Sequence, residues 1–265
     1  MNRIDKKFKE LRKRKKKAFI VYITAGDPSL TTTKRLILEL DKKGVDLIEL
    51  GIPFSDPLAD GPTIQAASQR ALSKGVNIKS ILRLVKGVRR KVEIPFVFMT
   101  YYNLIFQYGL EKFVIDAKKS GVDGVIVPDL PAEESQTLLK VAKRRNFSLV
   151  LLAAPTSTNN RLKTIAGKSD GFIYYVSLTG VTGARSRLAG DLYKNIRRLK
   201  RFTIKPVCVG FGVSNPRQAK KICSIADGVI VGSAIIRLIE KNLGKKNLVE
   251  KIGRFVGSIA KGIKR

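Results

Sequence analysis

Short apolar runs recur along the chain, and longer amphipathic stretches separate them. The runs are rich in β-branched and aromatic residues and are continuous rather than alternating, which is typical of strands buried on both faces of a parallel sheet. Between them, residues 33–43 and 134–145 place leucine, isoleucine and valine at helical spacing. The pattern predicts eight strands separated by helices, over residues 19–24, 47–50, 96–99, 124–127, 149–152, 172–176, 207–209 and 228–231.

A short repeat links the two halves of this pattern. The segment Asp-Gly-Val-Ile-Val occurs at residues 123–127 and again at 227–231, a spacing of four units of about 26 residues each. Matching fourth and eighth strands predict an α/β fold, the (β/α)8 TIM barrel, as a single domain over residues 1–265. A doubly wound open sheet is the alternative, but the loop after the first strand lacks the glycine-rich fingerprint that such a sheet would need.

The two ends of the chain carry patterns of their own. Residues 1–17 are predicted to be a short basic N-terminal extension. The stretch from about 246 to 263 places apolar residues on one helical face with lysines opposite. Such a helix could lie on a membrane, but we interpret it as the last helix closing against its barrel. No apolar run approaches the roughly 20 residues of a membrane span, so no membrane association is expected.

Charge and residue usage narrow the function further. The chain has 52 Lys and Arg against 21 Asp and Glu, a net charge of +31, and such a balance is typical of nucleic-acid-binding proteins. Because the basic residues are spread over nearly every polar segment, we do not favour nucleic-acid binding. Histidine is absent, which excludes histidine triads and histidine-ligated zinc. The two cysteines, Cys208 and Cys223, form no spacing motif, which predicts a reducing, cytoplasmic location.

Two acids stand on either side of a stiff loop at the end of the predicted second strand. Glu49 lies inside that apolar strand, and Asp60 follows a segment with prolines at 53, 57 and 62. Barrel enzymes carry their catalytic groups at the C-terminal ends of the strands, so the two acids are predicted to form an acid–base pair. Two structural alternatives remain: Glu49 could be ion-paired inside the barrel, and Asp60 could cap the helix that begins near Pro62.

Glycine-rich loops follow the last three predicted strands. They lie at residues 180–183, 210–212 and 232–233. TIM barrels commonly bind phosphate with the loops after strands 7 and 8 and with a helix N-terminus, because backbone N–H groups can approach the anion there. The three loops together predict a phosphorylated substrate.

The segment around the two acids, ELGIPFSDPLADGPTIQ at residues 49–65, resembles the signature of the tryptophan synthase α subunit family. Further matches to this family cover nearly the whole chain, at residues 18–28, 70–72, 99–103, 127–131, 133–134, 174–177, 180–183 and 210–212. The resemblance implies a (β/α)8 barrel that cleaves indole-3-glycerol phosphate to indole and glyceraldehyde 3-phosphate. It also implies no cofactor in this chain and a β-subunit partner, in an α2β2 tetramer, that uses its own pyridoxal phosphate to join indole to serine.

The resemblance assigns site residues position by position. It implies that Glu49, Asp60 and Tyr174 are catalytic, although Tyr175 beside Tyr174 leaves that alignment open. It places the substrate phosphate at Gly183, Phe211, Gly212, Gly232 and Ser233, and the apolar pocket at Tyr22 and Met99. From the residues themselves we predict no metal site, and an all-oxygen Mg²⁺ site stays open as the alternative. The chain departs from some relatives in having tyrosine rather than phenylalanine at position 22 and leucine rather than arginine at position 178.

The chemistry implied by this substrate suits two carboxyl groups with different tasks. Our hypothesis is that Glu49 protonates C3 of the indole and takes up the glycerol hydroxyl proton, while Asp60 stabilises the charge at the indole nitrogen. None of the predicted strands contains lysine, which disfavours a strand-borne Schiff base. Three alternatives remain: a related phosphate-binding barrel such as a phosphosugar isomerase, a nucleic-acid-binding protein on an enzyme-like scaffold, and a non-catalytic subunit that activates a partner.

Overall fold

The strands form a closed parallel barrel in the computed structural model, which describes residues 1–177, 185–210 and 212–264. They pair in the order β5-β4-β3-β2-β1-β9-β8-β7-β6. Only Leu151 separates β5 from β6, so the two ends of this row meet in one stretch of chain and the barrel closes. The strands are β1 (Ala18–Thr24), β2 (Leu47–Gly51), β3 (Phe96–Met99), β4 (Gly124–Ile126), β5 (Ser148–Val150), β6 (Leu152–Ala153), β7 (Ile173–Val176), β8 (Val207–Gly210) and β9 (Gly228–Val231). The predicted barrel and its strands are confirmed, with the fifth strand divided at Leu151.

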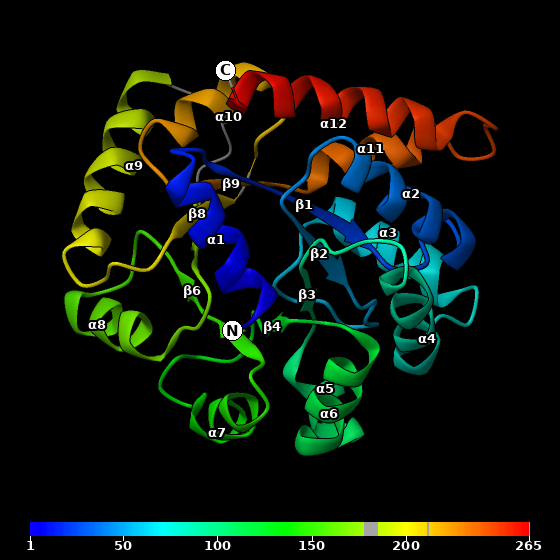
Figure 1. The fold of residues 1–265 in the computed structure, drawn as a ribbon, viewed down its shortest axis with the longest axis horizontal. Helices are drawn as coiled ribbons and strands as arrows, with labels where there is room; N and C mark the ends of the chain where they lie inside the picture. The colour runs from blue at the N-terminus through cyan, green and yellow to red at the C-terminus, as the bar shows by residue number, and fades with distance from the viewer. Residues whose placement is uncertain (178–184, 211, 265) are drawn as a thin grey trace.

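Helices surround this barrel on the outside (Figure 1). The predicted helices at 33–43 and 134–145 correspond to α2 and α7, and α2 begins earlier because the Ser29 side chain caps it by accepting from the Thr32 N–H. The helices are α1 (Arg3–Lys13), α2 (Leu30–Lys42), α3 (Pro62–Leu72), α4 (Ile78–Arg89), α5 (Tyr102–Tyr108), α6 (Leu110–Ser120), α7 (Gln136–Arg144), α8 (Asn159–Lys168), α9 (Arg185–Lys200), α10 (Pro216–Cys223), α11 (Ser233–Glu240) and α12 (Leu248–Lys264).

The two aspartates of the repeat, Asp123 and Asp227, and Asp46 at the equivalent position before β2 bind neighbouring strands together. Asp46, Asp123 and Asp227 each precede a strand and accept a hydrogen bond from a backbone N–H at the start of the preceding strand. The donors are Phe19 at 2.9 Å, Phe96 at 3.0 Å and Val207 at 3.0 Å respectively. The repeat therefore has a structural cause, because the same side chain satisfies the same orphan backbone donor in three units of the barrel.

Helix α1 lies across the end of the barrel where the strands begin (Figure 1). Its apolar face, Ile4, Phe8 and Leu11, is buried and packs against residues inside the barrel, including Phe172. The Asn2 side chain holds the start of the helix by donating to the Asp123 carbonyl at 2.7 Å. The basic N-terminal segment thus closes one end of the barrel with its apolar side and turns its lysines outward.

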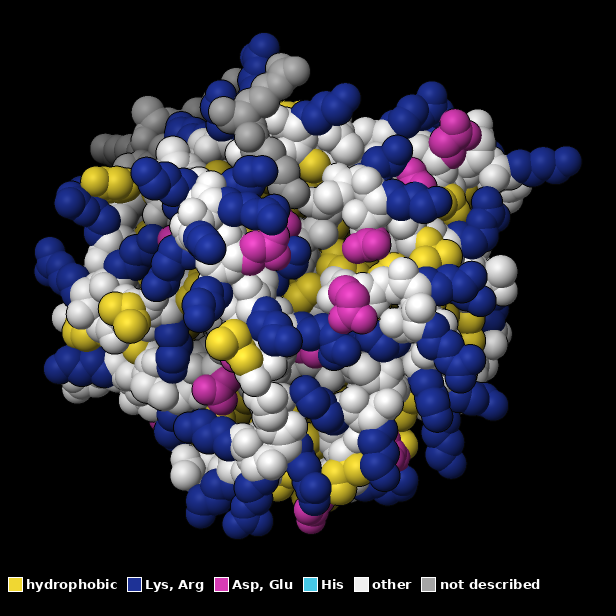
Figure 2. Space-filling view, in the orientation of Figure 1, with side chains coloured by type: hydrophobic (Ala, Val, Ile, Leu, Met, Phe, Trp, Pro, Cys, Tyr) yellow, Lys and Arg dark blue, Asp and Glu magenta, His cyan; other side chains and the backbone are white. Residues whose placement is uncertain are grey.

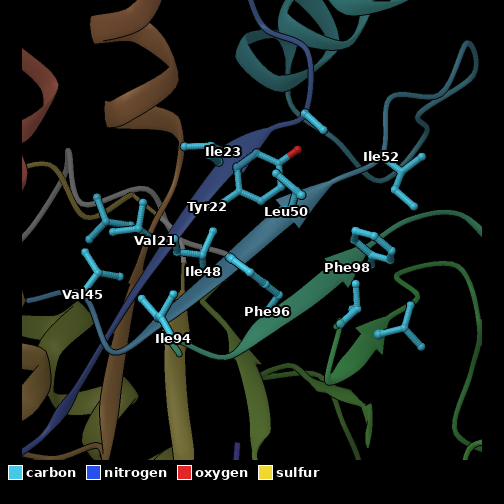
Figure 3. Close-up of a cluster of buried hydrophobic side chains, with 14 of the residues drawn as sticks. Val21, Tyr22, Ile23, Val45, Ile48, Leu50, Ile52, Ile94, Phe96 and Phe98 are labelled. Carbon is cyan, nitrogen blue, oxygen red and sulfur yellow. The ribbon is translucent and has the colours of Figure 1, made fainter. Parts of the chain in front are cut away.

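Two apolar clusters result from the alternation of side chains along each strand. Ile20, Leu47 and Val97 belong to the cluster inside the barrel. The larger cluster lies between the strands and the helices, and Figure 3 shows Val21, Ile48 and other members of it around β1, β2 and β3. Residues of either parity are therefore buried along these strands, which explains their continuous apolar runs.

The outer surface is basic over much of the view in Figure 2, and acidic side chains appear there only in scattered groups. Helix α12 buries Ile252, Val256 and Ile259 and packs against α2 and α10, so its apolar face is used within the fold. In the part of the chain that the structure describes, no helix is both long and apolar enough to cross a membrane.

Candidate active site

Glu49 lies inside the barrel, on the same face of β2 as Leu47. It stands opposite Tyr22 of β1 and Val97 of β3 in the strand pairing and is only 1 % exposed. Neither carboxyl oxygen has a hydrogen-bond partner among the described residues, so the predicted alternative of an internal ion pair is wrong. Burial, and after it the nearby carboxylate of Asp60, raises the pKa of Glu49 to about 8. The side chain therefore carries a proton at neutral pH.

Asp60 lies in the loop that leads from β2 to α3. Gly61 is the N-cap of α3, Pro62 is its first residue, and no side chain caps it. The helix-cap alternative for Asp60 is therefore wrong. Burial raises the pKa of Asp60 to about 6, and a hydrogen bond from the Tyr101 hydroxyl acts in the opposite direction. At neutral pH the site thus holds a protonated Glu49 beside an ionised Asp60.

Only one of the two adjacent tyrosines on β7 lines the same interior space. Tyr174 packs inside the barrel near Cys208, whereas Tyr175 packs in the outer cluster against the helices. The pKa of Tyr174 is raised well above its usual value, first by burial and then by the charges of Glu49, Tyr22 and Asp60. Tyr174 therefore faces the carboxyl groups and Tyr175 does not.

Tyr22 approaches the site from β1. Its hydroxyl lies 3.2 Å from the Thr24 hydroxyl, and burial followed by the charge of Asp60 raises its pKa far above the usual range. Met99, at the end of β3, stands opposite Gly51, is half-buried and packs against both apolar clusters. These side chains give the space around the carboxyl groups an apolar wall with hydroxyl groups in it.

Glycines and a helix N-terminus meet at the ends of β8 and β9. Gly212 adopts a left-handed backbone conformation with φ of 75°. Gly232 is the N-cap of α11 and Ser233 is its first residue, with no side-chain cap. The first N–H groups of an uncapped helix are available to an anion. Gly183, Phe211 and Leu178 lie outside the described residues.

Comparison with known proteins decides the family. The model of the family described as "Tryptophan synthase alpha chain" matches residues 8–264. A tryptophan synthase alpha chain from Geotalea daltonii is 51% identical over 263 residues, which is 99% of each chain. The chain belongs to the tryptophan synthase α chain family.

Solved structures agree with this family. The tryptophan synthase α subunit of Legionella pneumophila str. Paris superposes with a TM-score of 0.93 at 37% identity, covering 99% of this chain and 98% of its own. A chain of the tryptophan synthase α2β2 complex from Pyrococcus furiosus superposes with a TM-score of 0.87 at 40% identity, covering 93% and 99%. The predicted lyase of tryptophan biosynthesis is therefore preferred over the phosphosugar isomerase alternative.

The α chain site contains further residues to which the sequence analysis gave no individual role. Methyl groups on Gly51 and Gly210 would overlap the hydroxyls of Tyr22 and Tyr174, so each tyrosine lies across a glycine of the next strand. Tyr101 reaches Asp60 from the end of β3. The segment at 99–103 contained the signal for Tyr101, but nothing in its spacing distinguishes Tyr101 from Tyr102. Among the described residues, no three His, Cys, Asp or Glu side chains lie together as a metal site would require.

Proposed function

We propose that this tryptophan synthase α chain cleaves indole-3-glycerol phosphate to indole and glyceraldehyde 3-phosphate, with Glu49 and Asp60 as its acid–base pair. The observation that carries the proposal is the difference between the two carboxyl groups. Glu49 is buried and has no hydrogen-bond partner among the described residues, whereas Asp60 receives a hydrogen bond from Tyr101. One group is thus ready to give a proton while its neighbour is ready to stabilise positive charge.

In the first step the Glu49 carboxyl donates its proton to C3 of the indole ring. The ring nitrogen becomes positively charged, and the Asp60 carboxylate stabilises that charge through the N1–H group. The Glu49 carboxylate then removes the proton from the hydroxyl on the carbon attached to C3. The oxygen lone pair forms the aldehyde, the carbon–carbon bond breaks, and its electron pair returns to the ring. Indole leaves, Glu49 regains its proton, and neither a metal nor a cofactor of this chain takes part.

The remaining site residues bind and orient the substrate in this proposal. Gly212, Gly232 and Ser233, with Gly183 and Phe211, hold the phosphate, because Gly232 and Ser233 form the uncapped start of α11. Tyr22 and Met99 line the indole pocket, and Tyr174 lies beside the reacting groups.

We also propose a β subunit as partner, in an α2β2 assembly that receives the indole and holds the pyridoxal phosphate. Pyrococcus furiosus tryptophan synthase forms an α2β2 complex. In this chain, Leu58 is 95% exposed on the loop after β2, and Phe106 is 65% exposed on α5 after β3. Large exposed apolar side chains on the rim that carries the site suit a protein interface. A cytoplasmic location, based on the two cysteines, remains part of the proposal.

An indole-release assay tests the reaction and the partnership together. The purified chain is expected to release indole from indole-3-glycerol phosphate, and release is expected to rise when a β subunit from the same source is added. Leu58→Ser should weaken the response to the β subunit and leave release by the isolated chain unchanged. Absence of indole under both conditions would refute the proposed reaction, and release without any response to the β subunit would refute the partnership.

A further inference from the structure

Tyr101 connects the end of β3 to the loop that carries Asp60. It follows β3 and is the N-cap residue of α5. The side chain is almost fully buried, with the residue 5% exposed. Its neighbours in space are Phe54 and Ala59, both in the loop between β2 and α3 that ends at Asp60. Tyr101 therefore contacts this loop at two points separated along the chain.

The hydroxyl and the ring of Tyr101 make different contacts. The Ala59 N–H donates to the Tyr101 hydroxyl at 3.0 Å, which places this hydroxyl beside Asp60, the next residue, whose pKa it lowers as a hydrogen-bond donor. The ring lies 5.1 Å from the Phe54 ring, centroid to centroid, at an angle of 32°. The hydrogen bond from the Ala59 N–H thus orients the Tyr101 hydroxyl. The contact with Phe54 holds the ring in place beside Asp60.

Among the described residues, two further hydrogen bonds hold the loop at Asp60. The Asp60 N–H donates to the Pro57 carbonyl at 2.9 Å within the loop, and the Gln65 side chain donates to the Asp60 carbonyl at 2.8 Å. Both bonds hold the backbone of Asp60 and neither holds its carboxylate. Leu58, two residues before Asp60, is 95% exposed, so the tip of the loop is not anchored in the core.

We propose that Tyr101 is the positioning residue of Asp60, holding its carboxylate in the orientation that meets the indole nitrogen. The inference rests on the proposed function, since it assigns a residue to the same reaction. Tyr101 itself touches no reacting atom and acts through Asp60. Its role differs from that of a core tyrosine because its hydroxyl, rather than its ring alone, is required.

The charged neighbourhood makes the hydroxyl important. Four groups interact electrostatically with Asp60 or Tyr101, and none of them supplies positive charge: Glu49 on β2, Tyr22 on β1, Tyr174 on β7 and Asp129 after β4. Burial raises the pKa of Asp60 to about 6, and the hydrogen bond from Tyr101 lowers it. Without this donor the ionised form loses its stabilisation, so the pKa of Asp60 rises.

Tyr101→Phe removes the hydroxyl and keeps the ring against Phe54. We expect kcat for indole release at pH 8 to fall about tenfold, with KM changed less than twofold, because a hydrogen bond to a charged group has roughly that effect on the transition state. The reaction needs ionised Asp60, so kcat/KM falls as the pH drops through its pKa. In the variant this acidic limb should move to higher pH by about one unit.

Tyr108→Phe is the matched control, because the Tyr108 hydroxyl also donates to a carboxylate, Asp116, at 2.8 Å but lies outside the site. Its pH profile should equal that of the wild type. Phe54→Leu loosens the ring contact alone and should shift the acidic limb in the same direction by a smaller amount. Circular dichroism and thermal unfolding establish that each variant is folded.

The outcomes separate the two proposals. No indole from the wild type defeats the proposed function before Tyr101 is tested. An active wild type with an unmoved acidic limb in folded Tyr101→Phe overturns the positioning role. If Tyr101→Phe does not fold, Phe54→Leu decides. An unmoved acidic limb of its kcat/KM profile overturns the positioning role, and a shift to higher pH supports that role.

Discussion

Buried acidic side chains at the two ends of the barrel differ in their hydrogen bonding. At the end covered by α1, Asp123 is fully buried and is hydrogen-bonded by Arg3 at 3.1 Å, by Arg89 at 3.4 Å and by the Phe96 N–H at 3.0 Å. Toward the other end, Glu49 is equally buried and has no partner among the described residues. The first end satisfies its charge and contributes to stability. The second leaves a carboxyl group unsatisfied, which is the expected cost of a group that must exchange a proton.

The largest expected effect is the loss of turnover when Glu49 is replaced. Glu49→Gln preserves shape and removes the exchangeable proton, so kcat for indole release should fall by at least about 10²-fold. KM should stay close to the wild-type value, because the amide fills the same space. Steady-state indole release measures both constants. Glu93→Gln, at an 86% exposed side chain near α1, is the control. Near-normal turnover by Glu49→Gln would remove Glu49 from the mechanism.

Substitution of Asp123, the hydrogen-bonded acid, should change stability rather than activity. Asp123→Ala removes the carboxylate beside Arg89, whose side chain is only 12% exposed, and should lower the free energy of unfolding by about 3 kcal/mol. Activity per folded molecule should not change, since Asp123 lies at the opposite end of the barrel. Urea unfolding measures the loss, and Glu93→Ala, which removes the exposed partner of the same Arg3, should cost less than about 0.5 kcal/mol. Equal losses in the two variants would contradict the distinction between the ends.

The pH dependence of stability sharpens the comparison. Glu49 has a folded-state pKa raised to about 8, above its usual value of 4.5. The unfolded chain therefore loses this proton first as pH rises, and wild-type stability declines from about pH 4.5 until the folded protein also ionises near pH 8. Glu49→Gln lacks this decline, so its stability relative to the wild type should rise by on the order of 4 kcal/mol between low pH and pH 8. Thermal unfolding from pH 5 to pH 9 should show the difference growing and then levelling off, and a constant difference would mean that Glu49 is not protonated in the fold.

Much of the fold could be predicted because buried parallel strands leave a strong apolar signal. The break at Leu151 could not, since it depends on how β5 and β6 pair with different neighbours. The role of α1 was accessible in principle: Ile4, Phe8 and Leu11 stand at helical spacing, but the surrounding lysines and arginines dominate that segment.

The candidate site residues also differ in how far the sequence alone predicts them. Glu49 could be found because an acid within an apolar strand is conspicuous, and Asp60 because prolines surround it. The orientation of Tyr174 over Tyr175 required the strand pairing, which decides the face of the sheet. Tyr101 required the folded loop, because its contact with Ala59 joins residues that are 42 positions apart. Sequence patterns identify residues with local signals, whereas contacts between loops depend on tertiary structure.

The smallest expected effect comes from comparing the same substitution at the repeated aspartates. Asp123 and Asp227 both accept a strand N–H, but the Asp123 side chain is fully buried, whereas that of Asp227 is 32% exposed, with Lys200 at 3.0 Å and Lys17 at 3.8 Å. Asparagine keeps the acceptor in both cases and removes only the charge. Asp227→Asn should therefore cost less than about 1 kcal/mol, with the loss shrinking in high salt. Asp123→Asn should cost more and respond less to salt, because Arg89 is shielded from solvent. Urea unfolding at low and high salt distinguishes the two, and identical salt responses would show that burial does not separate the two aspartates.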